Sequence, residues 1–477
     1  MLIKRSLPIV LFINLFYLIW VFPYLNGIAG IIFYVAELGF FSLLLVFGFC
    51  HWEGKHVFET GIKAKGTVDV FITCLNEPVA MIEKTLKASV NIDYGHKKVF
   101  LLDDGNRNEL KKLAEKYAAI YLARERHINE KAGNLNNGLM NSDSEFIFTL
   151  DADQVPDKEV LKKTLGYFTK SEKIAFVTTR QRFDVHKQDF NKDHMFYEHM
   201  QTGKNADACS ISCGSGVIYR RSALEKIGGF KTWNLVEDVY TSFELHRHGF
   251  TSLYINKAYT TGLAPQDLKN IYKQRGTWAV DSLRLLFKKN PLFAKGLSFN
   301  QRIHYFEIGY IYLVAGVFFP ILFCLPIVSL LTNVPLLFVG VEFIFIRLLG
   351  LLSIVWFYSR LNEGSEGTRF WTGLWPIFST AALLAAVPGK IKYRVTSKAE
   401  TSKRRIKLIL PQLTILSLGI ISIYFNVYAY GLSNNTLANS LWVFVVAWWM
   451  WPVIVKGFSS KFIHTPTLHT QIEGEYT

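Results

Sequence analysis

The sequence predicts an α/β domain with a doubly wound, mostly parallel sheet, inserted between two groups of membrane-spanning helices. Three observations support this. Apolar runs of about 20 residues, long enough to cross a bilayer, lie toward both ends of the 477-residue chain. Between them, short β-branched segments alternate with helical patterns, which is typical of a parallel sheet. Half of the residues are hydrophobic and only 19% are charged, a balance that fits a multi-pass membrane protein carrying one polar domain.

Residues 1–55 are predicted to form a transmembrane hairpin. The runs Ser6–Asn26 and Ile28–Cys50 are each long enough to span, and the basic residues Lys4 and Arg5 precede the first. A signal peptide is the alternative for the first run, but no small-residue cleavage site follows it and a second span comes at once. We therefore expect both ends of the hairpin in the cytoplasm.

Residues 56–289 are predicted to form the cytoplasmic domain. Strands are expected at Val68–Ile72, Lys98–Leu102, Phe146–Leu150 and Ile174–Val177, and helices at Val79–Val90 and Asn108–Tyr117. In doubly wound sheets, ligands bind beyond the carboxyl ends of the strands. Three polar groups follow these strands and are expected to converge there: Asn76-Glu77, Asp103-Asp104 and Asp151 with Asp153.

Residues 290–477 return to the membrane. Four further spans are expected, at Tyr305–Leu331, Pro335–Tyr358, Leu408–Tyr430 and Leu437–Val455, giving six in total. The apolar run Phe370–Val387 is rich in Trp, Pro and Gly, so we favour an interfacial helix there. Glu342 and Arg347 fall inside a span, and five residues on a helix place them about 140° apart, so they are not expected to pair with each other. Each is expected to contact either neighbouring helices or hydroxyl groups in a channel.

The net charge of +15 does not indicate nucleic-acid binding, because the Lys and Arg residues are dispersed rather than gathered in one basic patch. The five cysteines lack paired zinc-type spacing, so we interpret them as reduced thiols.

The strongest candidate site begins with Asp151-Ala152-Asp153 at a predicted strand end. Two carboxylates one residue apart can hold Mg²⁺ or Mn²⁺ against a diphosphate. Asp pairs are also common in ordinary loops. Lys131, in Lys131-Ala132-Gly133-Asn134, offers a cation to a phosphate or ribose, although any exposed Lys would look the same.

Three later motifs carry further chemistry. Cys213-Gly214-Ser215 forms a small-residue turn before a strand, where backbone can approach a ligand, or alternatively a bulge. Glu237-Asp238 precedes a helix over Val239–Arg247, so Asp238 is either a first-turn carboxylate or a general base. Gln274-Arg275-Gly276-Thr277-Trp278 is expected to open a helix, with Arg275 gripping a diphosphate and Trp278 facing a sugar ring, or acting only as an interfacial anchor.

With these motifs in order, the sequence resembles the processive glycosyltransferases of family 2, most closely the bacterial cellulose synthase catalytic subunits. The signature Asp, Asp-x-Asp, Thr-Glu-Asp and Gln-x-x-Arg-Trp is similar to the segments Asp103/Asp104, Asp151/Asp153, Val236–Asp238 and Gln274–Trp278. Phe71–Pro78 resembles the nucleotide-binding strand of the family, and Tyr393–Lys398 resembles its gating loop, including Thr396 and Lys398.

The resemblance implies a GT-A fold, a UDP-sugar donor and inversion to a β-linked product. The implied donor-binding residues are Asn76, Glu77, Asp103, Asp104, Lys131, Asp151, Gln274, Arg275, Thr396 and Lys398. The implied acceptor-binding residues are Cys213, Gly214, Ser215 and Trp278. Asp151 and Asp153 would bind Mg²⁺ or Mn²⁺, and Asp238 would be the base, with Glu237 beside it.

Four departures from the family pattern stand out. Thr277 replaces an Arg, Leu75 replaces a Tyr of the nucleotide pocket, Val236 replaces a Thr, and Thr178–Phe183 keeps few residues of the family's Gln-Thr-Pro-His segment. No cyclic-dinucleotide-binding domain is expected.

We therefore expect a multi-pass plasma-membrane enzyme that polymerises a UDP-sugar, UDP-glucose in the first instance, and passes the polysaccharide through the lipid bilayer. One alternative is a glycolipid synthase that adds a single sugar to a membrane lipid. Another is a chitin- or hyaluronan-type synthase that uses UDP-N-acetylglucosamine. A non-catalytic membrane protein is disfavoured, because both metal carboxylates, Asp238 and Arg275 are all present.

Overall fold

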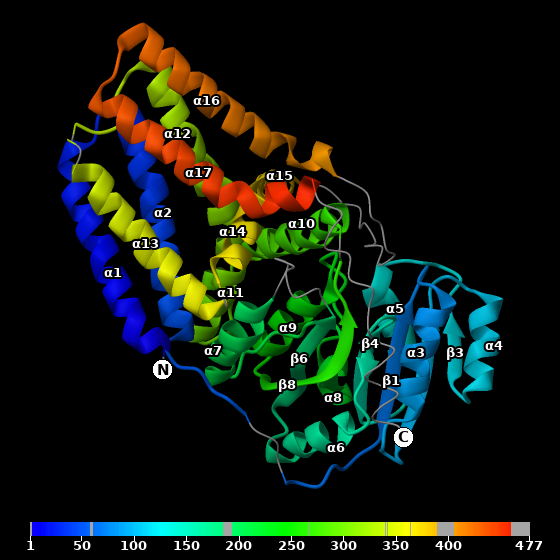
Figure 1. The fold of residues 1–477 in the computed structure, drawn as a ribbon. Helices are drawn as coiled ribbons and strands as arrows, with labels where there is room; N and C mark the ends of the chain where they lie inside the picture. The colour runs from blue at the N-terminus through cyan, green and yellow to red at the C-terminus, as the bar shows by residue number, and fades with distance from the viewer. Residues whose placement is uncertain are drawn as a thin grey trace.

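The computed structural model describes residues 2–57, 61–184, 193–265, 267–338, 340, 342–362, 364–388 and 405–458. The segment expected to be a gating loop, with Thr396 and Lys398, lies outside these residues. Figure 1 shows the long apolar helices gathered on one side of the molecule and the sheet domain on the other. Four helices lie where the two parts meet (Figure 1): α10 (Leu268–Arg284), α11 (Phe299–Leu313), α14 (Ser365–Gly373) and α15 (Trp375–Ala386).

The central domain contains an eight-stranded sheet in the order β3-β2-β1-β4-β7-β6-β8-β5. The strands are β1 (Val68–Cys74), β2 (Lys97–Asp103), β3 (Ile120–Ala123), β4 (Phe146–Asp151), β5 (Val155–Pro156), β6 (Ile174–Asp184), β7 (Val217–Arg220) and β8 (Thr251–Leu263). The first four in sheet order run parallel, whereas β7 is antiparallel to both β4 and β6. The expected mostly parallel sheet is therefore confirmed on one side of β4 and becomes mixed on the other.

Strand β1 explains why the polar motifs meet. All seven of its residues are buried, as expected of a central parallel strand covered on both faces. It pairs with β2 on one side and β4 on the other, with Cys74 opposite Asp103 and Thr73 opposite Asp151. The carboxyl ends of β1, β2 and β4 therefore lie along one edge of the sheet.

Helices cover both faces of the sheet and carry the later motifs. They are α3 (Val79–Val90), α4 (Asn108–Lys116), α5 (Glu130–Met140), α6 (Val160–Thr164), α7 (Gln201–Ala206), α8 (Arg221–Lys226), α9 (Glu237–Arg247) and α10 (Leu268–Arg284). The expectation that Gln274 opens a helix is wrong. Helix α10 begins earlier because the Asp267 side chain accepts the Asn270 backbone N–H and caps it, so Gln274–Trp278 lies inside the helix.

Six helical segments in the described part of the chain are long and apolar enough to cross a membrane, as expected. They are Leu2–Tyr24, Gly27–His51, Phe299–Thr332, Glu342–Leu361, Ile406–Tyr430 and Asn434–Phe458. They contain α1 (Leu2–Val21), α2 (Gly27–His51), α11 (Phe299–Leu313), α12 (Phe319–Thr332), α13 (Glu342–Leu361), α16 (Leu410–Tyr430) and α17 (Asn434–Phe458). The third segment starts earlier than the predicted Tyr305, because Ser298 and Gln301 form a capping box.

The apolar run Phe370–Val387 does not form one interfacial helix. It is divided between α14 (Ser365–Gly373) and α15 (Trp375–Ala386), with the break at Leu374. Helix α15 packs against α10, and Phe378 is fully buried in the same apolar cluster as Val280. This segment therefore supports the helix that carries the Gln-x-x-x-Trp motif.

Buried charges within the membrane helices are paired. Arg347 on α13 forms an ion pair with Glu37 on α2 at 2.6 Å and lies 3.5 Å from the ring centroid of Trp442 on α17. As expected, Arg347 contacts neighbouring helices rather than Glu342. Because an unpaired charge in a bilayer is costly, this contact ties three helices together.

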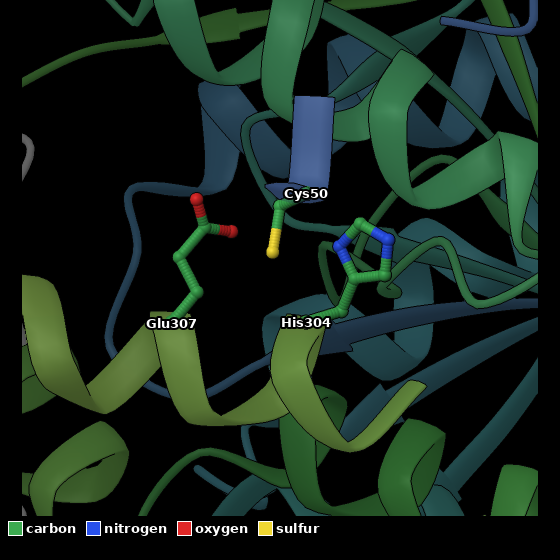
Figure 2. Close-up of side chains that lie close together, drawn as sticks. All are labelled: Cys50, His304 and Glu307. Carbon is green, nitrogen blue, oxygen red and sulfur yellow. The ribbon is translucent and has the colours of Figure 1, made fainter. Parts of the chain in front are cut away.

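A second buried cluster joins the central domain to the membrane helices, and we call it the junction cluster: His51, Lys204, His304 and Glu307. The Glu307 oxygens contact His51 Nε2 at 2.6 Å and Lys204 Nζ at 2.7 Å. Figure 2 shows Cys50 facing His304 and Glu307, which project from one helix. Cys50, His304 and Glu307 are residue types that can bind a metal, but the Lys204 ammonium already neutralises the Glu307 carboxylate. We therefore describe the cluster as an ionic link between α2, α7 and α11.

Candidate active site

A cavity of about 500 Å³ lies between the carboxyl edge of the sheet and the membrane helices. Its lining includes Glu77, Asp104, Lys131, Asp151, Asp153, Glu237, Asp238, Gln274, Arg275 and Trp278 from the central domain. It continues past Phe47, Tyr358, Trp371 and Trp449 on the membrane side. Most of the predicted site residues are thus brought together around one space.

The turns after β1 and β2 form the end of the cavity where the sequence predicts the nucleotide. The Glu77 carboxylate accepts the Leu75 backbone N–H at 2.7 Å, which shapes the turn, and both residues line the cavity. Asp104 also lines it and forms a two-point ion pair with Arg124, at 2.5 and 2.7 Å. Sequence reasoning missed Arg124, because nothing in the sequence indicates which carboxylate a loop arginine meets.

Asp103 and Asn76 are not among the residues that line the cavity. Asp103 is fully buried, and its oxygens accept the N–H groups of Gly105 at 2.9 Å and Arg107 at 2.7 Å and the hydroxyl of Tyr121 at 2.9 Å. Its carboxylate therefore shapes the turn behind the wall, while Asp104 faces the cavity. Asn76 is exposed on the neighbouring turn.

Lys131 lies between the metal-type carboxylates and the proposed base. Its ammonium is 2.7 Å from Asp151 Oδ1 and 3.1 Å from Glu237 Oε1, and it donates to the Gly214 carbonyl at 3.1 Å. Burial by itself would lower the pKa of Lys131, but Asp151 and Glu237 together hold it well above its ordinary value. Lys131 is therefore a fixed cation in the cavity wall.

Asp151 and Asp153 present hard oxygen donors to the same cavity. Asp151 is partly exposed, and its backbone N–H donates to Ser215 Oγ at 2.9 Å. Asp153 is buried and accepts the Leu263 backbone N–H at 3.1 Å. This pair fits the binding of a divalent cation such as Mg²⁺ or Mn²⁺.

Glu237 and Asp238 form the first turn of α9. Burial, followed by the neighbouring Glu237 charge, raises the pKa of Asp238 to about 8, and Lys131 opposes the rise. One oxygen, Oδ1, accepts the Val239 backbone N–H at 2.6 Å. Asp238 is thus a half-buried carboxylate with a raised pKa that lines the cavity, and these are properties that a general base requires.

The predicted acceptor turn approaches this base closely. Gly214 adopts φ +74°, and a side chain there would lie 3.2 Å from Asp238 Oδ2, so glycine keeps the space open. Cys213 lines the cavity. Ser215 does not line the cavity; it is fully buried, and its hydroxyl accepts the Asp151 backbone N–H.

The α10 motif forms the opposite wall. The Arg275 guanidinium lies 4.8 Å from the ring centroid of Trp278 and pairs with Asp193 at 2.6 Å. Asp193 was not predicted, because its distance in sequence from Arg275 gives no signal of contact. Thr277, in place of the family Arg, bonds to the Lys273 carbonyl of its own helix at 2.9 Å.

Comparison with known proteins agrees with this architecture. A family model described as "Glycosyltransferase like family 2" matches residues 65–280, and one described as "Cellulose synthase" matches residues 225–469. Cellulose synthase 1 of Komagataeibacter xylinus is 30% identical over 406 residues, covering 79% of this chain and 26% of the relative. The UDP-forming cellulose synthase catalytic subunit of Pseudomonas fluorescens (strain SBW25) is 32% identical over 288 residues, covering 57% of this chain and 39% of the relative. The chain thus spans between a quarter and two fifths of these relatives.

Among solved structures, a mannosyltransferase from Pyrobaculum calidifontis in complex with GDP-Man and Mn²⁺ aligns with a TM-score of 0.56 and 17% identity. The alignment covers 75% of this chain and 98% of the mannosyltransferase chain. At this identity the likeness concerns the fold, and it confirms the expected GT-A architecture. The sheet domain, its flanking membrane helices and the matched families together show that the chain belongs to the cellulose synthase family.

Proposed function

We propose that this protein is a membrane-embedded, inverting glycosyltransferase that polymerises a UDP-sugar into a β-linked polysaccharide and passes it through its membrane helices. UDP-glucose is the proposed donor, and the sheet domain is proposed to face the cytoplasm. The UDP-forming cellulose synthase subunits among the relatives support this donor and product. Retention of the charged site residues across one cavity supports catalysis rather than a purely structural role.

One observation carries the proposal: the cavity is continuous from the carboxylates of the sheet to aromatic side chains of the membrane helices. A donor bound at the sheet edge and an acceptor lying against Trp278 would share this space. An elongating chain would have an exit lined by Tyr358, Trp371 and Trp449, whose ring faces suit sugar rings.

In the proposed reaction, the acceptor hydroxyl attacks the anomeric carbon of the donor while the bond to UDP breaks on the opposite face. Asp238 takes the hydroxyl proton, for which its raised pKa suits it. Trp278 holds the acceptor ring in register with this carboxylate. Lys131 and Arg275 place positive charge where the departing diphosphate develops negative charge.

Asp151 and Asp153 would hold the divalent cation. When bound, Mg²⁺ or Mn²⁺ supplies Lewis-acid neutralisation of the diphosphate. The chain contributes the two oxygen donors and the Lys131 contact that keeps Asp151 in place.

The decisive experiment measures UDP release by the full chain in lipid vesicles with Mg²⁺. Four donors are compared: UDP-glucose, UDP-N-acetylglucosamine, UDP-galactose and UDP-glucuronate, and the products are sized. We expect one preferred donor and a long, lipid-free polymer. No turnover with any donor, by protein that remains folded, would refute the proposal.

A second candidate, transfer of a single sugar to a membrane lipid, is favoured by Thr277. Its hydroxyl bonds within its own helix, so the planar cation expected at this wall is missing. In the same experiment this function would yield product that migrates only with lipid and carries one or two sugars.

A further inference from the structure

Asp281 is a buried carboxylate on α10 to which the proposed reaction assigns no role. It lines the active-site cavity and is 4% exposed. Its Oδ1 accepts the Leu235 backbone N–H at 3.2 Å, and its Oδ2 accepts the Val236 backbone N–H at 2.6 Å. The Asn234 side chain also donates to the Asp281 carbonyl, at 3.3 Å. Three consecutive residues before α9 are therefore held by one residue of α10.

The held segment leads directly into the proposed base. Val236 is the N-cap residue of α9 and makes no side-chain capping bond, because valine has no acceptor. Asp281 instead accepts the backbone N–H of the N-cap residue itself and that of Leu235 before it, and so fixes the chain at the point where α9 begins. The first turn that begins there carries Glu237 and Asp238.

The same helix carries the acceptor platform. Trp278 precedes Asp281 by three residues, and residues at this spacing lie on the same face of a helix. Asp281 thus connects the helix that presents Trp278 to the turn that presents Asp238. A shift of about 1 Å between such groups is enough to lower a rate by about 100-fold.

The charge of Asp281 also acts on the base. Asp238 is faced by Glu237 and Asp281, which raise its pKa, and by Lys131, which lowers it. Cys213 and Tyr219 are the other titratable groups that interact with it. Asp281 is itself faced by Glu237 and Arg284; burial raises its pKa to about 7, and the Val236 and Leu235 N–H groups oppose the rise.

We propose that Asp281 is a positioning residue for glycosyl transfer, which holds the turn carrying Asp238 at a set distance from Trp278 and adds negative charge beside the base. The inference rests on the proposed role of Asp238. This role explains why a carboxylate is buried where α10 meets the start of α9.

The test compares Asp281→Ala, Asp281→Asn and Asp267→Asn in the full chain in vesicles, by kcat, by KM for the donor and by the pH dependence of kcat/KM. Asp267 is the matched control, because its carboxylate also accepts a backbone N–H at a helix start, but at the start of its own helix α10. We expect Asp281→Ala to lower kcat by about 10–100-fold with little change in KM. Asp281→Asn should move the acid limb of the profile to lower pH, because one like charge is removed. Asp267→Asn should leave that limb in place.

A second measurement does not require turnover. Amide hydrogen exchange over residues 234–238 should accelerate in Asp281→Ala and not in Asp267→Asn. Unchanged exchange there would overturn the inference even if the wild-type protein transferred no sugar. If the wild type transfers sugar and Asp281→Ala matches it in kcat and pH profile, the positioning role is also excluded, while the proposed function stands.

Discussion

Two charge clusters in this molecule are built from similar residues and differ in burial and in their balance of charge. In the cavity cluster (Lys131, Asp151, Glu237 and Asp238), one ammonium faces three carboxylates. In the junction cluster, the Lys204 ammonium contacts one oxygen of Glu307 and the His51 imidazole contacts the other. The cavity cluster therefore carries an excess of negative charge, whereas in the junction cluster the carboxylate is neutralised by its own partners.

This difference in charge balance distinguishes the cavity cluster, a candidate ligand site, from the junction cluster, a structural link between helices. In the cavity cluster three carboxylates share one ammonium, and a bound cation or a proton would balance the excess negative charge. A carboxylate with both oxygens partnered has little left to offer a ligand and instead holds helices together. Changes in the cavity cluster should therefore affect turnover, and changes in the junction cluster should affect stability.

The largest expected effect separates the two clusters directly. Asp238→Asn removes the base without changing side-chain volume, so we expect kcat to fall by about 10²–10⁴-fold. The midpoint of thermal unfolding should not fall, because the substitution removes a buried like-charge contact with Glu237. UDP release and thermal unfolding in detergent check both parts. Near-normal turnover would contradict Asp238 as the base.

The junction cluster should behave in the opposite way. Glu307→Gln leaves the Lys204 ammonium buried without its counter-charge, which we expect to lower the free energy of unfolding by about 3–5 kcal/mol. The double variant Glu307→Leu with Lys204→Met should recover most of that loss, because no charge remains unpaired. Thermal unfolding of both variants in detergent measures this. Equal destabilisation by the single and double variants would argue against an ionic link.

The metal carboxylates give a smaller, titratable effect. Asp153→Asn removes one anionic oxygen donor while keeping the Leu263 backbone N–H partnered. We expect the Mg²⁺ or Mn²⁺ concentration for half-maximal UDP release to rise by about tenfold or more, because the remaining donors bind the cation more weakly. Saturating metal should restore much of the rate. The exposed substitution Asp143→Asn, at a surface ion pair, serves as the control.

The last prediction concerns the pH dependence of stability. Asp238 has a pKa of about 8 in the folded protein, against about 4 for an ordinary Asp. Between these values the folded state holds a proton that the unfolded state has lost, so this group makes stability fall as the pH rises from about 4 to 8. Asp238→Asn should flatten that slope. Thermal unfolding in metal-free buffer at several pH values measures it, and parallel slopes would contradict the raised pKa.

Local patterns in the sequence were sufficient to predict much of the fold. The segments around Val70, Val99 and Phe148 are β-branched or apolar runs bounded by turns, and each is a buried strand of the sheet. The six spans were equally visible, because length and hydropathy are properties of a continuous segment. Helix starts were less visible where a cap decided them, as at Asp267 and Ser298.

Part of the candidate site could be predicted, because the order of the strands fixes which residues lie at the carboxyl edge of the sheet. Carboxylates placed after parallel strands must meet at one edge, so Asp104 and Asp151 were found from sequence. The sequence does not tell which of the two adjacent aspartates, Asp103 or Asp104, faces the cavity. Asp103 points inward because its carboxylate accepts backbone N–H groups of its own turn. The same limit applies to Ser215, which supports Asp151 from behind.

The sequence by itself determined the fold class, the number of spans and the kinds of chemical group at the site, because each depends on composition and order along a short stretch. Only the tertiary structure decided the pairings: Arg275 with Asp193, Lys131 between Asp151 and Glu237, and Asp281 beneath the start of α9. Such pairings join residues far apart in the chain. Their energies depend on the distance between two atoms and on the exclusion of water around them, and only the folded structure sets these two quantities.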